Sequence, residues 1–475
     1  MLSHAASLIA VLAIVTIACA APTFTDRTAD LGLTIPNAAA CWADFDNDGW
    51  VDLCAGGIIW KNNGGTSFSK LAEGFGSCVA ADFDNDGFVD LFSWSAVRVY
   101  RNDGGKGFTA IDMPQHPACV SRGACWADLN GDAFVDLYVG GYEDWNAGIT
   151  YPDLVFMNES GKSFRLARTD GRYRARGVTA ADFDQDGDLD VYVSNYRLQP
   201  NVLWINDGAG HLEDRAAEFN AIATSPGFNG GHSIGSAWGD FDNDGAIDLF
   251  AGNFAHVDNR GDQPKSRFLR NRGPEEGYVF EDLGTCGVFY QESYASPAAG
   301  DYDNDGDLDL FFTTVYATAS FGRKNNPVLF RNDGRFEFGN ATAETGLPDL
   351  GSTYQAAWAD FDNDGDLDLT TSGRLFVNVG AEGHWLRVQV IGDGEKVDRS
   401  SIGAQVRVVN ADGVRTRQVE AGTGEGNQND LTLHFGLGAN AGPVRVEVLW
   451  PGGLSLTMDE VMVDRLLTVR ARDVL

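Results

Sequence analysis

A nine-residue acidic pattern recurs seven times in this chain of 475 residues. Its form is D-x-D-x-D-G-x-x-D; the first copy spans residues 44–52, and the others begin at Asp82, Asp128, Asp182, Asp240, Asp301 and Asp360. Carboxylates at alternate positions before a glycine turn make an oxygen-rich loop, which suits calcium because that ion takes six to eight oxygen ligands in a flexible shell. Seven copies in matching phase therefore predict a repeated calcium-binding loop.

In such a loop the side chains at positions 1, 3, 5 and 9 and the main-chain carbonyl at position 7 are the expected ligands. The predicted metal-binding residues are Asp44, Asp46, Asp48, Trp50, Asp52, Asp82, Asp84, Asp86, Phe88, Asp90, Asp128, Asn130, Asp132, Phe134, Asp136, Asp182, Asp184, Asp186, Asp188, Asp190, Asp240, Asp242, Asp244, Ala246, Asp248, Asp301, Asp303, Asp305, Asp307, Asp309, Asp360, Asp362, Asp364, Asp366 and Asp368. An EF-hand is excluded, because position 12 never holds glutamate and the flanks are strand-like. We expect up to seven calcium ions.

The third loop departs from the pattern in two places. Asn130 supplies an amide at position 3, and Ala133 replaces the turn glycine. A left-handed backbone at alanine costs about 1 kcal/mol. We therefore expect the weakest calcium site at the Asp128 loop.

Each acidic loop lies inside one recurring unit of four short strands. A strand of small and aromatic residues precedes the loop, a second follows it, a third ends in an Asn-Asp-Gly or similar turn, and a fourth carries an aromatic residue such as Phe68 or Phe108. Four antiparallel strands per unit are typical of a β-propeller blade. The fold class predicted is all-β: a seven-bladed propeller over residues 21–381, then a small β-rich domain over residues 382–475.

Ring closure is also predicted from the sequence. The seventh unit lacks a fourth strand, and residues 24–33 resemble the fourth strand of unit six at residues 338–347. We expect the N-terminal strand to complete the seventh blade, which removes the open sheet edges. Two residues before the loops, large and small residues alternate around the ring, which indicates core packing between blades and places Trp42 and Trp358 in neighbouring blades.

Composition limits the possible partners, and the N-terminus indicates export. Asp and Glu number 68 against 35 Lys and Arg, giving a net charge of −33, which argues against nucleic acid and anionic membranes as partners. Residues 1–20 are typical of a secretory signal ending in Ala18-Cys19-Ala20, and no other stretch is long enough to cross a membrane. We expect a secreted or extracellular protein, in the periplasm or at the cell surface if the source is a Gram-negative bacterium; a lipoprotein anchored at Cys19 is the alternative. The six remaining cysteines could form disulfides or remain buried thiols.

The repeats resemble the FG-GAP/VCBS calcium-binding repeats of integrin α-subunit propellers. The final residues resemble the ASPIC/UnbV domain in Gly383-His384-Trp385-Leu386, His434-Phe435-Gly436-Leu437-Gly438 and Trp450-Pro451-Gly452-Gly453. This architecture is that of the cartilage acidic protein family and its bacterial relatives. The resemblance implies a secreted, calcium-loaded propeller with a role in adhesion or matrix interaction. The segment 422–428 fits the Gly-rich segment of the family only loosely.

Two functions remain open at this stage. The first is an adhesion or interaction scaffold with structural calcium, whose unknown ligand is a protein or a carbohydrate. The second is a secreted enzyme with its site among the insertions 140–153, 253–267 and 313–327 and the segment 219–234 between blades four and five, which we expect on the face opposite the calcium loops. The sequence holds no H-E-x-x-H or C-x-x-C motif, and no catalytic or cofactor-binding residue is predicted. A converging cluster of His, Asp and Glu on that face, where His232 and His256 fall, would favour the enzyme.

Overall fold

Strands form nearly all the regular structure of the computed structural model, which describes residues 22–258 and 260–474. The predicted signal peptide and Cys19 therefore lie outside the described residues. Within them the helical segments are four 3-10 turns: η1 (Pro274–Glu276), η2 (Ser320–Gly322), η3 (Pro451–Gly453) and η4 (Ala471–Asp473). The predicted all-β fold class is confirmed.

Seven antiparallel four-stranded sheets make up the first part of the chain. The first four blades are β2 (Ala40–Ala43), β3 (Asp52–Ala55), β4 (Ile58–Asn62), β5 (Phe68–Glu73); β6 (Cys78–Ala81), β7 (Asp90–Ser93), β8 (Arg98–Asn102), β9 (Phe108–Ile111); β10 (Ser121–Ala127), β11 (Asp136–Gly141), β14 (Asp153–Asn158), β15 (Phe164–Asp170); and β16 (Ala175–Ala181), β17 (Asp190–Asn195), β18 (Val202–Asn206), β19 (Leu212–Asp214). The other three are β20 (His232–Gly239), β21 (Asp248–Phe254), β24 (Arg267–Asn271), β25 (Phe280–Gly284); β26 (Tyr294–Gly300), β27 (Asp309–Thr314), β28 (Val328–Asn332), β29 (Phe338–Asn340); and β30 (Ala356–Ala359), β31 (Asp368–Thr371), β32 (Arg374–Val379), β1 (Thr23–Asp26).

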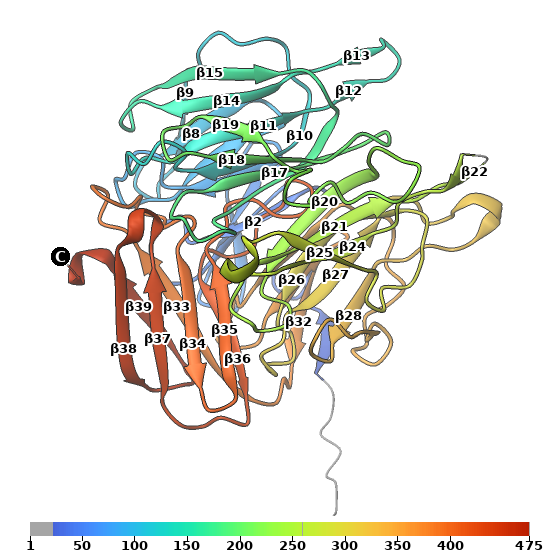
Figure 1. Cartoon of the computed structure of the whole chain (residues 1–475). Helices are drawn as coiled ribbons and strands as arrows, with labels where there is room; N and C mark the ends of the chain where they lie inside the picture. Colours follow the sequence, from blue (N-terminus) through green and yellow to red (C-terminus); the bar gives the residue numbers. More distant parts are fainter. Residues whose placement is uncertain (1–21, 259, 475) are drawn as a thin grey trace, which may run out of the picture.

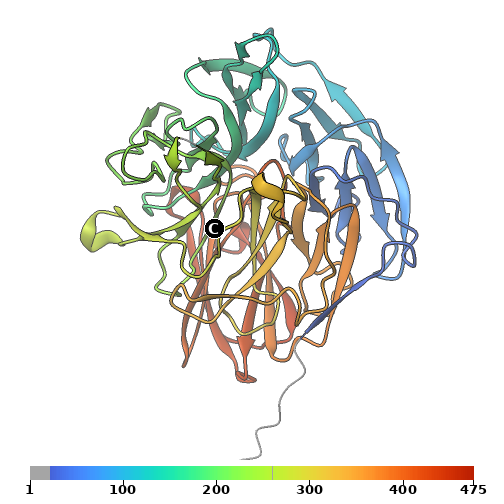
Figure 2. The same cartoon turned by 90° about the vertical axis from the view of Figure 1, so that its right-hand side faces the viewer.

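The N-terminal strand fills the fourth place of the seventh blade. β1 pairs antiparallel with β32, with Phe24 opposite Asn378. The innermost strands contact one another in order around the ring, and β30 returns to contact β2. Figure 2 shows the blades arranged around one axis.

The alternating tryptophans pack in the interior. Trp42 and Trp126 have no exposed surface, and Trp358 and Trp238 are 2% and 3% exposed. Trp42 and Trp358 stand on the innermost strands of the neighbouring first and seventh blades. All six cysteines in the described part of the chain carry free thiols.

Residues after the ring form two further sheets, drawn in red and orange in Figure 1. β33 (His384–Ile391) pairs antiparallel with β36 (Leu433–Gly438) and parallel with β39 (Arg465–Arg470). The second sheet has the order β35 (Gly413–Gln418), β34 (Gln405–Asn410), β37 (Val444–Leu449), β38 (Ser455–Val461). Alternating valines of β34 and β37 enter a core cluster that continues into blades two to four. We call residues 384–474 the C-terminal domain.

A glycine-rich hairpin of the C-terminal domain runs through the channel of the ring, and we call residues 418–430 the plug. Hydrogen bonds join the plug to the innermost strands of all seven blades, through Ala40, Ala80, Trp126, Ala180, Ser236, Ser296 and Trp358. Gly424 has a φ of 58°, and a Cβ there would lie 2.2 Å from the Ser296 hydroxyl oxygen. The channel therefore leaves room only for glycine at this position.

Two small hairpins project on the side away from the C-terminal domain (Figure 1). One pairs β12 (Glu143–Asp144) with β13 (Ile149–Thr150), and the other pairs β22 (Val257–Asp258) with β23 (Gly261–Asp262). They lie in two of the predicted insertions.

Candidate metal centres

Every acidic loop connects the innermost strand of a blade to its second strand, so the seven loops lie on one face of the ring. Positions 4 and 6 of each loop have left-handed backbone, for example Asn47 at 58° and Gly49 at 86°. Ala133 also takes this conformation, with a φ of 67°, as predicted for the third loop.

The carboxylate at position 1 is oriented by the backbone of its own loop. In the second loop, the N–H groups of Asp86 and Gly87 donate to the two oxygens of Asp82 at 3.1 and 2.7 Å. Burial raises the pKa of Asp82 to about 7. A nearby cation would oppose that effect of burial, because it favours the ionised carboxylate.

Position 3 gives the sharpest test of whether the loops fit calcium. In six loops the Oδ1 atom at this position is buried without a hydrogen-bond partner; the residues are Asp46, Asp84, Asp184, Asp242, Asp303 and Asp362. Within each of several loops, three carboxylate oxygens lie within 4.8 Å of one another; in the second loop they belong to Asp82, Asp84 and Asp86. A buried carboxylate oxygen needs a donor or a cation, so the residues present fit a calcium ion. The exception is the third loop, where Asn130 stands at position 3.

Position 9 has a structural role that the sequence pattern did not reveal. Asp90 accepts the N–H of Phe83 at one oxygen and the N–H of Asn102 at the other, at 3.0 and 2.6 Å. The Asn102 amide then donates 2.7 Å to the Phe45 carbonyl of the preceding blade. An equivalent asparagine lies at the end of the third strand in every blade and donates to a carbonyl of the previous loop: Asn62, Asn102, Asn158, Asn206, Asn271, Asn332 and Asn378. The recurrence of this asparagine in the repeats is the sequence signal that points to its role.

Amides at position 4 link successive loops. Asn47 donates 2.7 Å to the Gly87 carbonyl, and Asn85 donates 2.8 Å to that of Ala133. The third loop has Gly131 at this position and so has no side chain to reach the fourth loop. The third loop therefore differs from the other six in two ways. It has an amide in place of the position-3 carboxylate, and it has no side-chain hydrogen bond to the next loop.

In two loops a basic side chain from the third strand of the same blade lies beside the predicted ligand carboxylates. Lys61 Nζ contacts Asp46 and lies 2.7 Å from Asp48 Oδ2. Arg270 lies 2.7 Å from Asp242 and 2.9 Å from Asp244. The equivalent position in the third loop's blade is Met157. These side chains would compete with a metal ion for the same oxygens.

The C-terminal domain covers the face that carries the loops. Arg387 lies 3.0 Å from Asp360, and the Gly436 N–H donates 2.9 Å to Asp301. The imidazole of His434 is hydrogen-bonded to the Gly365 carbonyl at 2.9 Å. Ligands of two predicted calcium sites therefore also hold the neighbouring domain.

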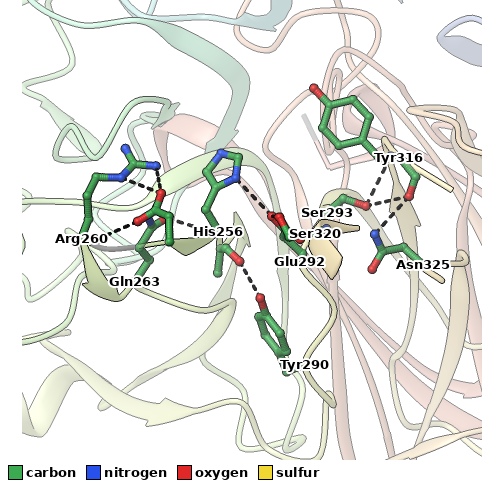
Figure 3. Close-up of polar contacts among 11 residues, drawn as sticks. His256, Arg260, Gln263, Tyr290, Glu292, Ser293, Tyr316, Ser320 and Asn325 are labelled. Atoms are coloured by element: carbon green, nitrogen blue, oxygen red, sulfur yellow. Dashed lines mark hydrogen bonds and ion pairs between the residues drawn. The ribbon is translucent and has the colours of Figure 1, made fainter. Parts of the chain in front are cut away.

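The face opposite the acidic loops carries a cluster of histidines and a carboxylate. The sequence pointed to the two histidines, but not to the carboxylate. His256 Nδ1 lies 3.3 Å from Glu292 Oε1, and Glu292 also accepts the N–H and hydroxyl of Ser320 at 2.6 and 2.8 Å (Figure 3). The His232 ring lies 5.0 Å from that of His256. Burial lowers the pKa of His232 to about 3. His232 and His256 thus come together with Glu292, which the sequence did not single out.

Sequence comparisons agree with this architecture. Residues 82–139, 182–251 and 301–371 match the FG-GAP-like repeat, and residues 394–474 match the ASPIC and UnbV family. The chain is thus an FG-GAP repeat β-propeller protein with a C-terminal ASPIC/UnbV domain. It is a homologue of cartilage acidic protein 1, being 27% identical to the Mus musculus protein over 376 residues and 26% identical to the Homo sapiens protein over the same length. These alignments cover 73% of this chain and 53% and 52% of those proteins, so the chain spans about half the length of the curated relatives it matches.

Solved structures of low sequence identity are also similar to this chain. BBS1N, from its complex with ARL6DN, has a TM-score of 0.45 and 11% identity, with 75% of this chain and 97% of that chain covered. The V. cholerae biofilm matrix protein Bap1 has a TM-score of 0.31 and 10% identity, with 93% and 71% covered. Within the described residues, no helix has the length and apolar character needed to cross a membrane.

Proposed function

We propose that the protein is an extracellular interaction scaffold whose seven acidic loops bind calcium as a structural ion. The observation that carries this proposal is the set of six buried position-3 oxygens without a hydrogen-bond partner. Calcium at millimolar concentration outside cells fills even weak sites of this type. The ions would neutralise the loops and hold the C-terminal domain through Asp301 and Asp360, which leaves the opposite face for a ligand.

The test is a thermal melt of the mature protein in excess chelator and after calcium is restored. A ligand that binds only the folded state stabilises it by about 2.7 kcal/mol per site at one hundred times its Kd. We expect a large and reversible rise of the midpoint. An unchanged midpoint would contradict the calcium assignment.

A pair of variants localises the effect. Asp84→Ala removes a position-3 carboxylate and should reduce the calcium-dependent rise of the midpoint. Asp103→Ala removes an exposed carboxylate outside the loops, which accepts bonds from Arg101 and Thr109. This control should leave the rise unchanged.

A secreted enzyme is the second candidate, and one observation favours it. The Glu292 carboxylate beside His256 Nδ1 gives the arrangement in which a carboxylate orients a histidine as a general base. Hydrolysis of a panel of chromogenic esters and glycosides, compared between the wild type and His256→Gln, tests it. Turnover that depends on His256 would support the enzyme; a silent panel leaves the scaffold as the better assignment.

A further inference from the structure

We propose that the face opposite the acidic loops carries a composite site for an acidic saccharide, built by blades three, four and seven together with the tip of the plug. The proposal rests on the proposed scaffold function in placing the ligand on this face. It adds the residues and the ligand chemistry.

The centre of the site is a cluster of arginines and tyrosines at the axis. The guanidinium of Arg176 lies 4.9, 5.2 and 5.4 Å from the ring centroids of Tyr142, Tyr354 and Tyr196. Arg122 lies 5.6 Å from the Tyr142 ring. These residues stand at the starts of innermost strands or beside the ends of second strands, which are the strand ends opposite the acidic loops. Three half-buried aromatic rings therefore converge from three blades.

The C-terminal domain supplies the floor of this cluster. Glu425, at the tip of the plug, accepts from Arg176 Nε and Nη2 at 2.8 and 2.5 Å. Its other oxygen, Oε2, is buried without a hydrogen-bond partner. Glu425 itself is 3% exposed, so the unsatisfied oxygen is a buried acceptor at the base of the site. A ligand hydroxyl or a bound water would satisfy it.

The hairpin β12–β13 forms one side of the site. Trp145 lies in the turn of this hairpin and is 66% exposed. The Arg197 guanidinium lies 3.9 Å from the centre of the Trp145 ring. Arg197 and Arg174 both donate to Glu143, whose side chain is 4% exposed. The two arginines retain 34% and 27% of their side-chain exposure, so they remain reachable from solvent.

Charge and ring chemistry together select the ligand. Four guanidinium groups (Arg122, Arg174, Arg176 and Arg197) face two carboxylates, Glu143 and Glu425, although the whole chain has a net charge of −33. In the described part of the chain no carboxylate pairs with Arg122. Guanidinium groups bind carboxylate or sulfate groups in bidentate geometry, and exposed aromatic faces accept the apolar face of a sugar ring. An acidic saccharide satisfies both requirements at once.

The experiment is titration calorimetry of the full chain at saturating calcium with trigalacturonate as the carboxylate probe and a heparin hexasaccharide as the sulfate probe. We expect at least one of them to bind, and the preferred probe identifies the anionic group. Arg122→Ala should weaken binding about tenfold, because it removes a charge-assisted hydrogen bond to the anionic group of the probe. Trp145→Ala should weaken it about threefold to tenfold through lost stacking. Arg465→Ala, an exposed arginine of the C-terminal domain, is the control and should bind like the wild type.

Three results would overturn the proposal. They are no binding of either acidic probe, binding that is unchanged in both variants, and equal binding of maltotriose, which carries no charge. Tighter binding of hexaglutamate, lost in the same variants, would replace the saccharide with an acidic protein segment. The calcium melt is independent of these outcomes, so failure of the ligand proposal is distinguishable from failure of the scaffold proposal.

Discussion

Arg176 and Glu425 form a buried ion pair between the propeller and the C-terminal domain. Arg176 belongs to the innermost strand of blade four, and Glu425 to the plug, with side-chain exposures of 6% and 3%. A buried charge left without its partner is strongly destabilising, whereas an exposed ion pair contributes little. The pair therefore couples the folding of the two domains.

Removing one member of this pair should destabilise the whole chain. We expect Glu425→Ala to lower the free energy of unfolding by about 3–5 kcal/mol, measured by urea denaturation at constant calcium. The matched control is Asp459→Ala, which breaks an exposed pair with Arg445 and should cost less than about 1 kcal/mol. Equal losses in the two variants would contradict the coupling.

The asparagine that joins neighbouring blades should contribute strongly to the free energy of unfolding, although it is a polar residue. Asn158 is 3% exposed, and its amide donates to the Phe83 and Val135 carbonyls at 2.8 and 3.1 Å. Asn158→Ala leaves two buried acceptors unsatisfied, so we expect a loss of roughly 2–5 kcal/mol in the same denaturation assay. Asn63→Ala, at an exposed turn, should stay within about 0.5 kcal/mol of the wild type.

The Lys61 side chain beside the first loop should weaken calcium binding at that loop. Lys61→Met removes an amine that contacts Asp46 and Asp48, and Met157 shows that this residue fits the equivalent place. We expect the calcium affinity of the first loop to rise about twofold to fivefold, because that change corresponds to the free energy of a partly exposed ion pair. Calcium titration calorimetry at low total calcium measures the change. Lys70→Met, an exposed lysine paired with Glu73, is the control; an equal effect there would indicate a general charge effect instead.

Acidification should destabilise the protein through His232. Burial is the main cause that lowers its pKa to about 3, with His256, Arg260 and Arg197 acting in the same direction and Asp258 opposing them. The ordinary pKa of histidine is about 6.5, so below that pH the unfolded chain binds a proton that the folded chain refuses. The stability from this group is complete above about pH 6.5 and is lost as the pH falls toward 3.

The measurement is the slope of unfolding free energy against pH between 6.5 and 4 at fixed calcium. His232→Gln should flatten the slope relative to the wild type by up to about 1.4 kcal/mol per pH unit. His211→Gln, at an exposed histidine of blade four, serves as the control. A slope that is identical in the wild type and His232→Gln would mean that His232 titrates normally.

Much of the ring could be predicted from the repeat alone. Seven phased copies predicted seven blades, and the unmatched strand around Phe24 predicted its pairing with the strand that holds Asn378. Local signals sufficed because each blade repeats the same turn, the same loop and the same buried aromatic positions. The left-handed backbone at Ala133 followed for the same reason, since its place in the repeat requires a positive φ.

The tertiary structure alone decided how the C-terminal domain meets the ring. No periodicity in residues 418–430 indicates that they cross a channel, because their partners lie on seven blades far away in the sequence. The convergence of Arg176, Tyr142 and Tyr354 with Glu425 has the same origin. The sequence by itself determined the acidic loops, the blades and their closure, because these depend on contacts within one repeat or between similar repeats. The plug and the opposite face depend on long-range contacts between unlike segments, which only the folded chain brings together.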